Sequence, residues 1–208
     1  VVDEHKDYRY ILSGSSDFLL MQNISQTLAG RVAVTRLLPL SISELKEDAN
    51  IDTNTLMWKG FYPGVWGDGK DPGNVYDSYV STYLQRDVRQ ILNIKDLSLF
   101  QKFLTIVASR VGNVFIASSI ASELGVDYKT IQSWMSILET SYTAFLLQPF
   151  HRNIGKRMTK TPKVYFYDVG LVCYLLGIEN EQHIKTHPLR GAIFENMVVC
   201  EMLKKRYN

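Results

Sequence analysis

The chain has 208 residues, of which 46% are hydrophobic and 21% are charged, and its net charge is +2. This composition is that of an ordinary globular protein and excludes wholesale disorder, and the length allows one or two domains. The near balance of charge excludes a uniformly basic nucleic-acid binder, so any basic patch must be local.

The first 46 residues carry alternating strand and helix patterns. Residues 8–12 predict a short strand, residues 17–28 a helix that Ser16 or Asp17 can cap, and residues 32–40 a second strand. A short helix capped by Ser41 or Ser43 follows. This order is typical of the end of an α/β layered domain.

Residues 47–95 are expected to be a linker. Glycine and proline recur in residues 50–76 and predict a surface loop, whereas apolar spacing in residues 76–93 predicts a helix. The loop contains Gly64-Val-Trp-Gly-Asp-Gly-Lys70, one residue short of a phosphate-binding loop. Asp71 stands where that motif needs a Mg²⁺-binding Ser or Thr and would repel phosphate, so we do not expect a nucleotide site there.

Residues 96–167 give the most regular pattern. Helices are predicted at 99–111, 118–124 and 128–141, and strands at 143–149 and 163–167. The spacing of Ala121, Gly125 and Ile131 is that of a helix-turn-helix, with a small residue at the crossing and glycine at a left-handed turn. Trp134 fills the next inner position and is expected to be largely buried. The hairpin that follows makes the predicted domain a winged helix.

This domain supplies the candidate binding residues. Lys129 can contact a phosphate and Gln132 a base edge from the outer face of the second helix. The stretch from residue 140 to residue 167 has no acidic residue. Its cations, which form a local positive patch, are Arg152, Lys156, Arg157, Lys160 and Lys163. The patch can serve DNA or a protein partner, including the protein's own ATPase domain described below, and both alternatives stay open.

Other features carry less chemistry. His183 and His187 are four residues apart, but no third ligand is near, so surface histidines and no metal site are predicted. Cys173 and Cys200 cannot form a disulfide framework and are expected to be free, mostly buried thiols in a reducing cytoplasm. No apolar run approaches the roughly 18–20 residues of a membrane span.

The two ends of the chain predict a piece of a longer protein. The chain begins without methionine, and residues 189–208 form a helical pattern with an uncovered apolar face. Disordered ends that have been trimmed are the alternative.

Six segments together resemble one family. They are residues 10–16 (YILSGSS), 28–31 (LAGR), 37–41 (LLPLS), 83–88 (YLQRDV), 165–171 (YFYDVGL) and 189–195 (LRGAIFE). The set resembles prokaryotic AAA+-type ATPases that carry a C-terminal domain of unknown function. The implied fold is mixed α/β and mostly helical: the end of an ATPase domain at 1–46, the winged helix at 96–167 and a helical piece at 168–208.

The resemblance implies that the ATP- and Mg²⁺-binding half precedes Val1, so this chain alone is expected to bind no cofactor and to be inactive. Ser13 and Ser15 would then orient the attacking water. Arg31 would stabilise the transferred phosphoryl group, in cis or in a neighbouring subunit of an oligomer. The alternative is that residues 13–16 are only a turn with a helix cap and that Arg31 forms an ion pair with a carboxylate.

The C-terminal end of that family resembles a nuclease-like fold, of which Glu195 would be one incomplete or structural position. Two functions stay open: an ATP-driven regulator or DNA-associated machine, and a non-enzymatic winged-helix interaction module.

Overall fold

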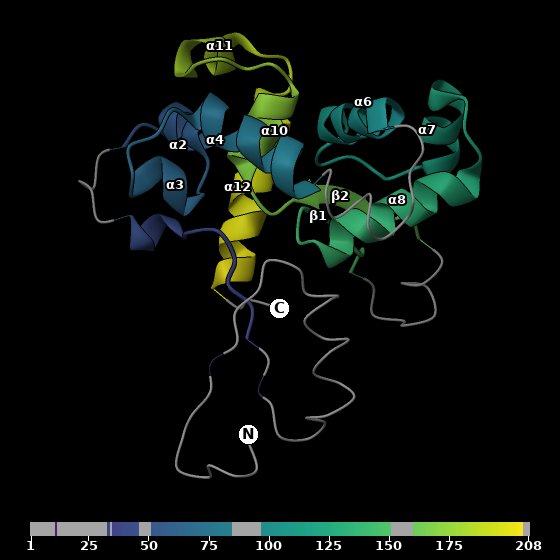
Figure 1. The fold of residues 1–208 in the computed structure, drawn as a ribbon, viewed down its shortest axis with the longest axis horizontal. Helices are drawn as coiled ribbons and strands as arrows, with labels where there is room; N and C mark the ends of the chain where they lie inside the picture. The colour runs from purple at the N-terminus through teal and green to yellow at the C-terminus, as the bar shows by residue number, and fades with distance from the viewer. Residues whose placement is uncertain are drawn as a thin grey trace. The chain divides into compact units, whose positions relative to one another are not determined.

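The computed structural model describes residues 11, 33, 35–45, 51–84, 97–150 and 160–205. The chain divides into two units, residues 1–35 and residues 36–208. Nearly all described residues belong to the second unit, whose elements Figure 1 labels. The domain boundaries expected at residues 46, 95 and 167 stay predictions.

The prediction of a surface loop at residues 50–76 is wrong. Those residues contain the helices α2 (Thr53–Lys59), α3 (Pro63–Trp66) and most of α4 (Pro72–Ser78), after the short 3₁₀ helix η1 (Ile42–Glu44). The prolines begin helices, because proline suits the first helical position, and Gly60 ends α2 at φ +64°. Glycine and proline therefore mark the ends of short helices. Five residues of this segment belong to the hydrophobic core: Leu56, Met57, Phe61, Val65 and Tyr76.

The helix expected from residue 76 begins earlier, at Pro72. It continues from α4 into a π-helix, η2 (Tyr79–Leu84). Asp71 caps α4 by accepting a hydrogen bond from Asn74 N, and Asp52 caps α2 in the same way through Asn54 N.

Three helices follow in the order that the sequence predicts: α6 (Leu97–Ser109), α7 (Ala117–Leu124) and α8 (Tyr128–Thr140). Gly125 ends α7 in the left-handed conformation, at φ +68°, and Asp127 caps α8. Trp134 is 5% exposed, so its predicted burial is confirmed. Its ring centroid lies 5.5 Å from that of Phe100 and 5.4 Å from that of Phe103.

Two strands form an antiparallel pair, β1 (Ala144–Leu147) and β2 (Lys163–Phe166), in which Ala144 faces Phe166. Residues 112–115 lie along the other edge of β2. There Gly112 N donates to Val164 O (2.9 Å) and Val164 N donates to Asn113 O (3.0 Å). The expected hairpin pairing is therefore present.

The C-terminal part is helical: α10 (Val169–Leu175), α11 (Glu181–Thr186) and α12 (Arg190–Lys204). Helix α12 contacts α10, α2 and β2, so it reaches both the first helices and the strands (Figure 1). The architecture of the described residues is thus mixed α/β and mostly helical, as expected. Both cysteines are buried and free. Among the described helices, none has the length and apolarity to cross a membrane.

Candidate functional site

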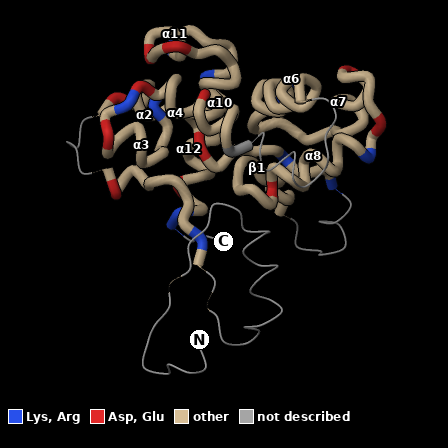
Figure 2. Tube along the Cα trace, viewed as in Figure 1, with Lys and Arg blue, Asp and Glu red and all other residues tan. Residues whose placement is uncertain are grey.

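The outer face of α8 carries few charges. Lys129 and Gln132 are both exposed, and Gln132 Nε2 donates to the Tyr128 hydroxyl at 2.9 Å. Most of the α8 trace in Figure 2 is neither basic nor acidic. The two residues predicted to contact DNA from α8 therefore both lie at the surface of this helix, and only one of them, Lys129, is a cation.

The predicted basic wing is described only in part. Lys160 is exposed, whereas the ammonium of Lys163 lies 2.9 Å from Glu195 of α12. The Tyr165 hydroxyl donates to the same carboxylate oxygen at 2.5 Å. The hydrogen bonds from Tyr165 and then from Lys163 lower the pKa of Glu195. Glu195 thus ties α12 to β2 and offsets one wing cation.

Several predicted site residues lie outside the described residues, and their roles stay predictions: Ser13, Ser15, Arg31, Arg152, Lys156 and Arg157. The described ranges contain no group of three side chains able to hold a metal ion. Neither Glu195 nor the pair His183 and His187 therefore belongs to such a group.

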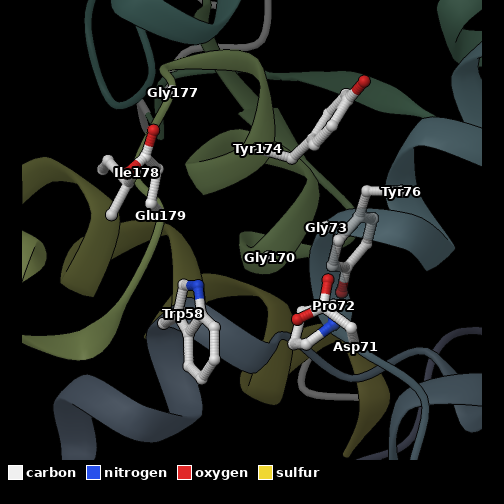
Figure 3. A pocket seen from close by; sticks show the side chains of 10 residues that line it. All are labelled: Trp58, Asp71, Pro72, Gly73, Tyr76, Gly170, Tyr174, Gly177, Ile178 and Glu179. Carbon is white, nitrogen blue, oxygen red and sulfur yellow. The ribbon is translucent and has the colours of Figure 1, made fainter.

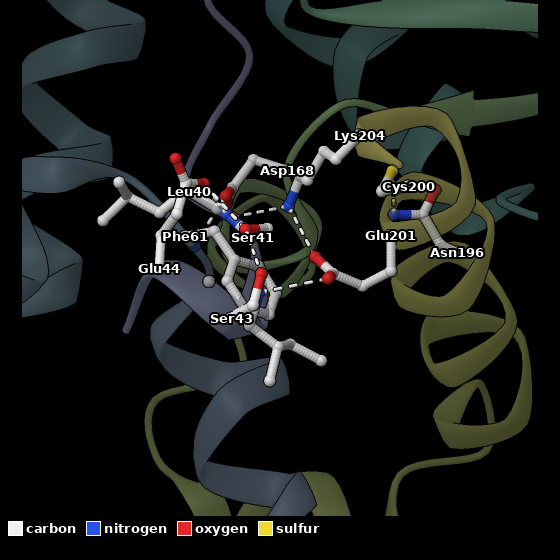
Figure 4. A network of polar contacts seen from close by, with 12 residues as sticks. Leu40, Ser41, Ser43, Glu44, Phe61, Asp168, Asn196, Cys200, Glu201 and Lys204 are labelled. Atoms are coloured by element: carbon white, nitrogen blue, oxygen red, sulfur yellow. Dashed lines mark hydrogen bonds and ion pairs between the residues drawn. The ribbon is translucent and has the colours of Figure 1, made fainter. Parts of the chain in front are cut away.

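Sequence reasoning missed a polar network where residues 40–44 meet α12 (Figure 4). Lys204 Nζ donates to Leu40 O at 2.7 Å and to Glu201 Oε1 at 2.9 Å. Glu201 Oε2 accepts from Ile42 N at 3.1 Å, and Leu40 N donates to Phe61 O at 2.9 Å. We call these contacts between residues 40–44, Phe61, Glu201 and Lys204 the clamp.

The charges of the clamp are shielded from water. The Lys204 side chain is 6% exposed, its ammonium lies 4.2 Å from the centroid of the Phe61 ring, and the Glu201 side chain is 12% exposed. Ser41 N and Ser41 Oγ both donate to Glu44 at 2.7 Å, which closes η1 as a capping box and lowers the pKa of Glu44. Residues 40–44 are thus held at both backbone and side-chain atoms.

A buried carboxylate lies next to the clamp. Asp168 caps α10 by accepting from Leu171 N (3.0 Å), and it also accepts from Phe61 N (2.7 Å) and from the Tyr76 hydroxyl (2.7 Å). Burial raises the pKa of Asp168, and these hydrogen bonds and the charge of Lys204 offset part of that effect. Phe61 therefore joins the clamp to Asp168 through its backbone.

Two glycines make room for this centre. A Cβ on Gly170 would lie 2.3 Å from the Tyr76 hydroxyl oxygen, and one on Gly60 would lie 2.1 Å from it. Only glycine therefore fits at these positions. The one local signal in the sequence is Asp168 itself, a cap residue directly before an apolar helix.

Comparison with known proteins places most of this architecture in one family. Residues 52–182 match the family described as a domain of unknown function (DUF8612). The chain belongs to the DUF8612 family. Residues 1–46 match an AAA domain, so the clamp residues 40–44 lie near the end of the AAA match, a few residues before the DUF8612 match begins at residue 52.

Relatives of this DUF8612 chain are longer. The uncharacterized proteins Mb2031c of Mycobacterium bovis and Rv2008c of Mycobacterium tuberculosis are each 28% identical over 196 residues, which cover 93% of this chain and 44% of the relative. An uncharacterized protein of Haemophilus influenzae is 22% identical over 214 residues, which cover 95% of this chain and 52% of the length of that protein. The chain thus spans about half the length of these relatives. No solved structure matches significantly.

Proposed function

We propose that this chain is part of an AAA-type ATPase in which residues 36–205 form an output module moved by the N-terminal domain. The observation that carries the proposal is the clamp. Where the AAA match ends, Lys204 and Glu201 of α12 hold the backbone of residues 40–44. A displacement of this segment must move α12 with it or break hydrogen bonds to charged groups, which are stronger than neutral ones.

In this proposal the intact protein binds and hydrolyses ATP with Mg²⁺. Ser13 and Ser15 would orient the attacking water, and Arg31 would stabilise the transferred phosphoryl group. These roles need the phosphate-binding residues that the AAA resemblance implies. The 208-residue chain alone is therefore expected not to bind ATP.

Hydrogen exchange in the intact protein tests the proposal. With ATP and Mg²⁺, the amides of Leu40 and Ile42 should change their exchange rate, because both donate hydrogen bonds within the clamp. The 208-residue chain treated in the same way is the control and should show no change. An intact protein without ATP turnover would contradict the ATPase assignment, whereas turnover with unchanged exchange at residues 40–44 would contradict only the role of the clamp.

We further propose that residues 96–167 are a winged helix. Support comes from the succession of α6, α7 and α8, from the left-handed turn at Gly125, and from the strand pair with residues 112–115 along its other edge. Winged helices bind either DNA or protein, so the fold does not choose between them.

Binding of duplex DNA is a second candidate, favoured by the exposed cations Lys129 and Lys160, for which the described residues supply no ion pair. Anisotropy titration of random-sequence duplex at several low salt concentrations tests it. Removing the charges of Lys156, Arg157 and Lys160 together should flatten the slope of log affinity against log salt by about 0.9 for each phosphate that is no longer neutralised.

The control for this titration is Lys70→Gln, because Lys70 lies outside the wing and is paired with Asp68 at 2.8 Å. An equal change of slope in this variant would contradict a specific role for the wing. No binding at low salt would remove the DNA candidate and leave protein docking as the use of this module.

A further inference from the structure

A pocket of about 310 Å³ opens between α2, the start of α4, α10 and the turn after α10 (Figure 3). Its volume is at the lower end of the range for small-ligand sites, about 300–1,000 Å³. Trp58 comes from α2, Asp71 and Tyr76 from the start of α4, Tyr174 from α10 and Glu179 from the following turn. The pocket shares no lining residue with the clamp or with α8, although Tyr76 and Gly170 line it and also belong to the centre around Asp168.

The side chains of the pocket combine aromatic rings with negative charge. Trp58 and Tyr174 are half-buried, whereas Asp71 and Glu179 are exposed. Figure 3 shows these two carboxylates on opposite sides of the opening. Among the residues that the structure describes, no lysine or arginine lines the pocket. Ring faces and carboxylates both attract cations, so the lining selects a positively charged ligand.

The lysines nearest in sequence are engaged elsewhere. Lys70 Nζ lies 2.8 Å from Asp68, and Lys59 Nζ lies 4.8 Å from the centroid of the Trp66 ring. A further carboxylate, Asp77, accepts from the Tyr174 hydroxyl at 2.7 Å and adds to the negative potential beside the pocket. Neither Lys59 nor Lys70, the lysines adjacent in sequence to Trp58 and Asp71, therefore neutralises the negative charge of the pocket.

An anion is disfavoured although the N-terminus of α4 faces this region. Asp71 already occupies that N-terminus, because its Oδ1 accepts from Asn74 N at 3.1 Å. A planar guanidinium suits the lining better than an ammonium. It can stack on an aromatic ring and at the same time direct two N–H groups at a carboxylate.

We propose that this pocket binds a guanidinium group, such as that of an arginine side chain presented by another polypeptide. The group would stack on the ring of Trp58 or Tyr174 and pair with Asp71 or Glu179. Free arginine has the same guanidinium, but its α-ammonium and α-carboxylate are both charged, and bringing these two groups against the pocket costs them hydration that the neutral amides of a polypeptide lose more cheaply. An arginine residue inside a polypeptide is therefore expected to bind more tightly than the free amino acid.

Nuclear magnetic resonance of the 208-residue chain can test the proposal through the three tryptophan indole signals. The probe is N-acetyl-L-arginine methylamide, whose only charge is the guanidinium. The Trp58 indole signal, assigned with a Trp58→Phe variant, should shift saturably. The signal of Trp134, which is buried in the α6–α8 core, should stay in place as an internal control.

Two comparison probes test separately whether the guanidinium charge is required and whether the arginine belongs to a polypeptide. The citrulline analogue has nearly the same shape without the charge and should not shift the Trp58 signal. Free L-arginine should bind more weakly than the blocked probe. Equal binding of free arginine would overturn the polypeptide source, and equal binding of the citrulline analogue would overturn the guanidinium site.

Charge-neutral variants complete the test. Glu179→Gln and Asp71→Asn should each weaken binding of the blocked probe by about 1.5-fold to fivefold, the range of exposed ion pairs. Asparagine still caps a helix, so Asp71→Asn should leave α4 folded. Asp127→Asn, the same change at the cap of α8, should leave the affinity unchanged. Unchanged affinity in both pocket variants, or no saturable shift up to the solubility limit of the probe, would overturn the site.

Discussion

The α6–α8 core and the centre around Asp168 are stabilised in opposite ways. In the first, Trp134 packs against Phe100 and Phe103, and the contacts are apolar. In the second, a buried carboxylate and a buried tyrosine hydroxyl lie near a lysine whose side chain is 6% exposed, and hydrogen bonds satisfy all three groups. In the first, Trp134 contacts residues 34 and 31 positions earlier in the chain, whereas in the second Phe61 and Asp168 are 107 residues apart and Leu40 and Lys204 are 164 apart. Local periodicity therefore specifies the first region, and long-range polar contacts join distant parts of the chain in the second.

The largest expected effect tests the apolar region. Trp134→Ala should lower the free energy of unfolding by about 3–5 kcal/mol, the cost of removing a large core aromatic. Tyr128→Ala is the control, because Tyr128 is on the same helix but 49% exposed, and its effect should be far smaller. Urea unfolding of both variants gives the comparison. Similar losses in the two would mean that the packing around Trp134 is not the source of stability.

The clamp is tested by Lys204→Met, which keeps the apolar stem and removes the ammonium. We expect a loss of about 2–3 kcal/mol, because Leu40 O loses its donor and the shielded Glu201 its partner. Lys205→Met, the exposed neighbour, should change stability little. Thermal unfolding measures both, and a Lys204 variant as stable as the Lys205 variant would contradict the clamp.

The buried carboxylate predicts an unusual pH dependence. Since burial raises the pKa of Asp168 above its ordinary value of 3.8, the folded state holds this proton more tightly than the unfolded state. This contribution to stability is complete below pH 3.8 and is lost as pH rises through the folded pKa. Asp168→Asn should be less stable by about 1–3 kcal/mol at the acidic end, and its gap to the wild type should narrow as pH rises.

Urea titrations of both proteins from about pH 4 to pH 8 measure this gap. Every other carboxylate is common to the two proteins, so its effect cancels in the difference. A gap that widens with pH would show that hydrogen bonds outweigh burial at Asp168.

The smallest effect concerns Glu195, whose pKa is lowered. Its contribution is present above its ordinary pKa of 4.5 and is lost as pH falls through the folded pKa. Because the Glu195 side chain is 45% exposed, Glu195→Gln should cost only about 0.2–1 kcal/mol at neutral pH and almost nothing in acid. A double-mutant cycle with Lys163→Met isolates the ion pair, and a coupling energy of zero would assign the effect to Tyr165 alone.

The sequence predicts the helical region because its signals are local. Ala121, Gly125, Ile131 and Trp134 lie within fourteen residues of one another, and each has the burial or backbone conformation that its spacing predicts. The first helices are missed because Gly60, Pro63 and Pro72 mark helix ends with the same residue types that mark turns. Nothing local in the sequence links Leu40 to Lys204 or Trp58 to Glu179. Such pairs arise only when the fold brings them together.

Asn196 has a consequence for the solubility of any shortened form of this protein. Its amide oxygen accepts from Phe166 N at 2.8 Å and its amide nitrogen donates to Phe166 O at 3.1 Å, so one side chain stands where a neighbouring strand would pair. It continues the line of bonds that residues 112 and 113 make with Val164. A chain cut before α12 would expose these backbone groups on a free sheet edge, which is a template for intermolecular pairing and aggregation. Aspartate could not replace Asn196, because a carboxylate accepts from Phe166 N but has no proton to give to Phe166 O.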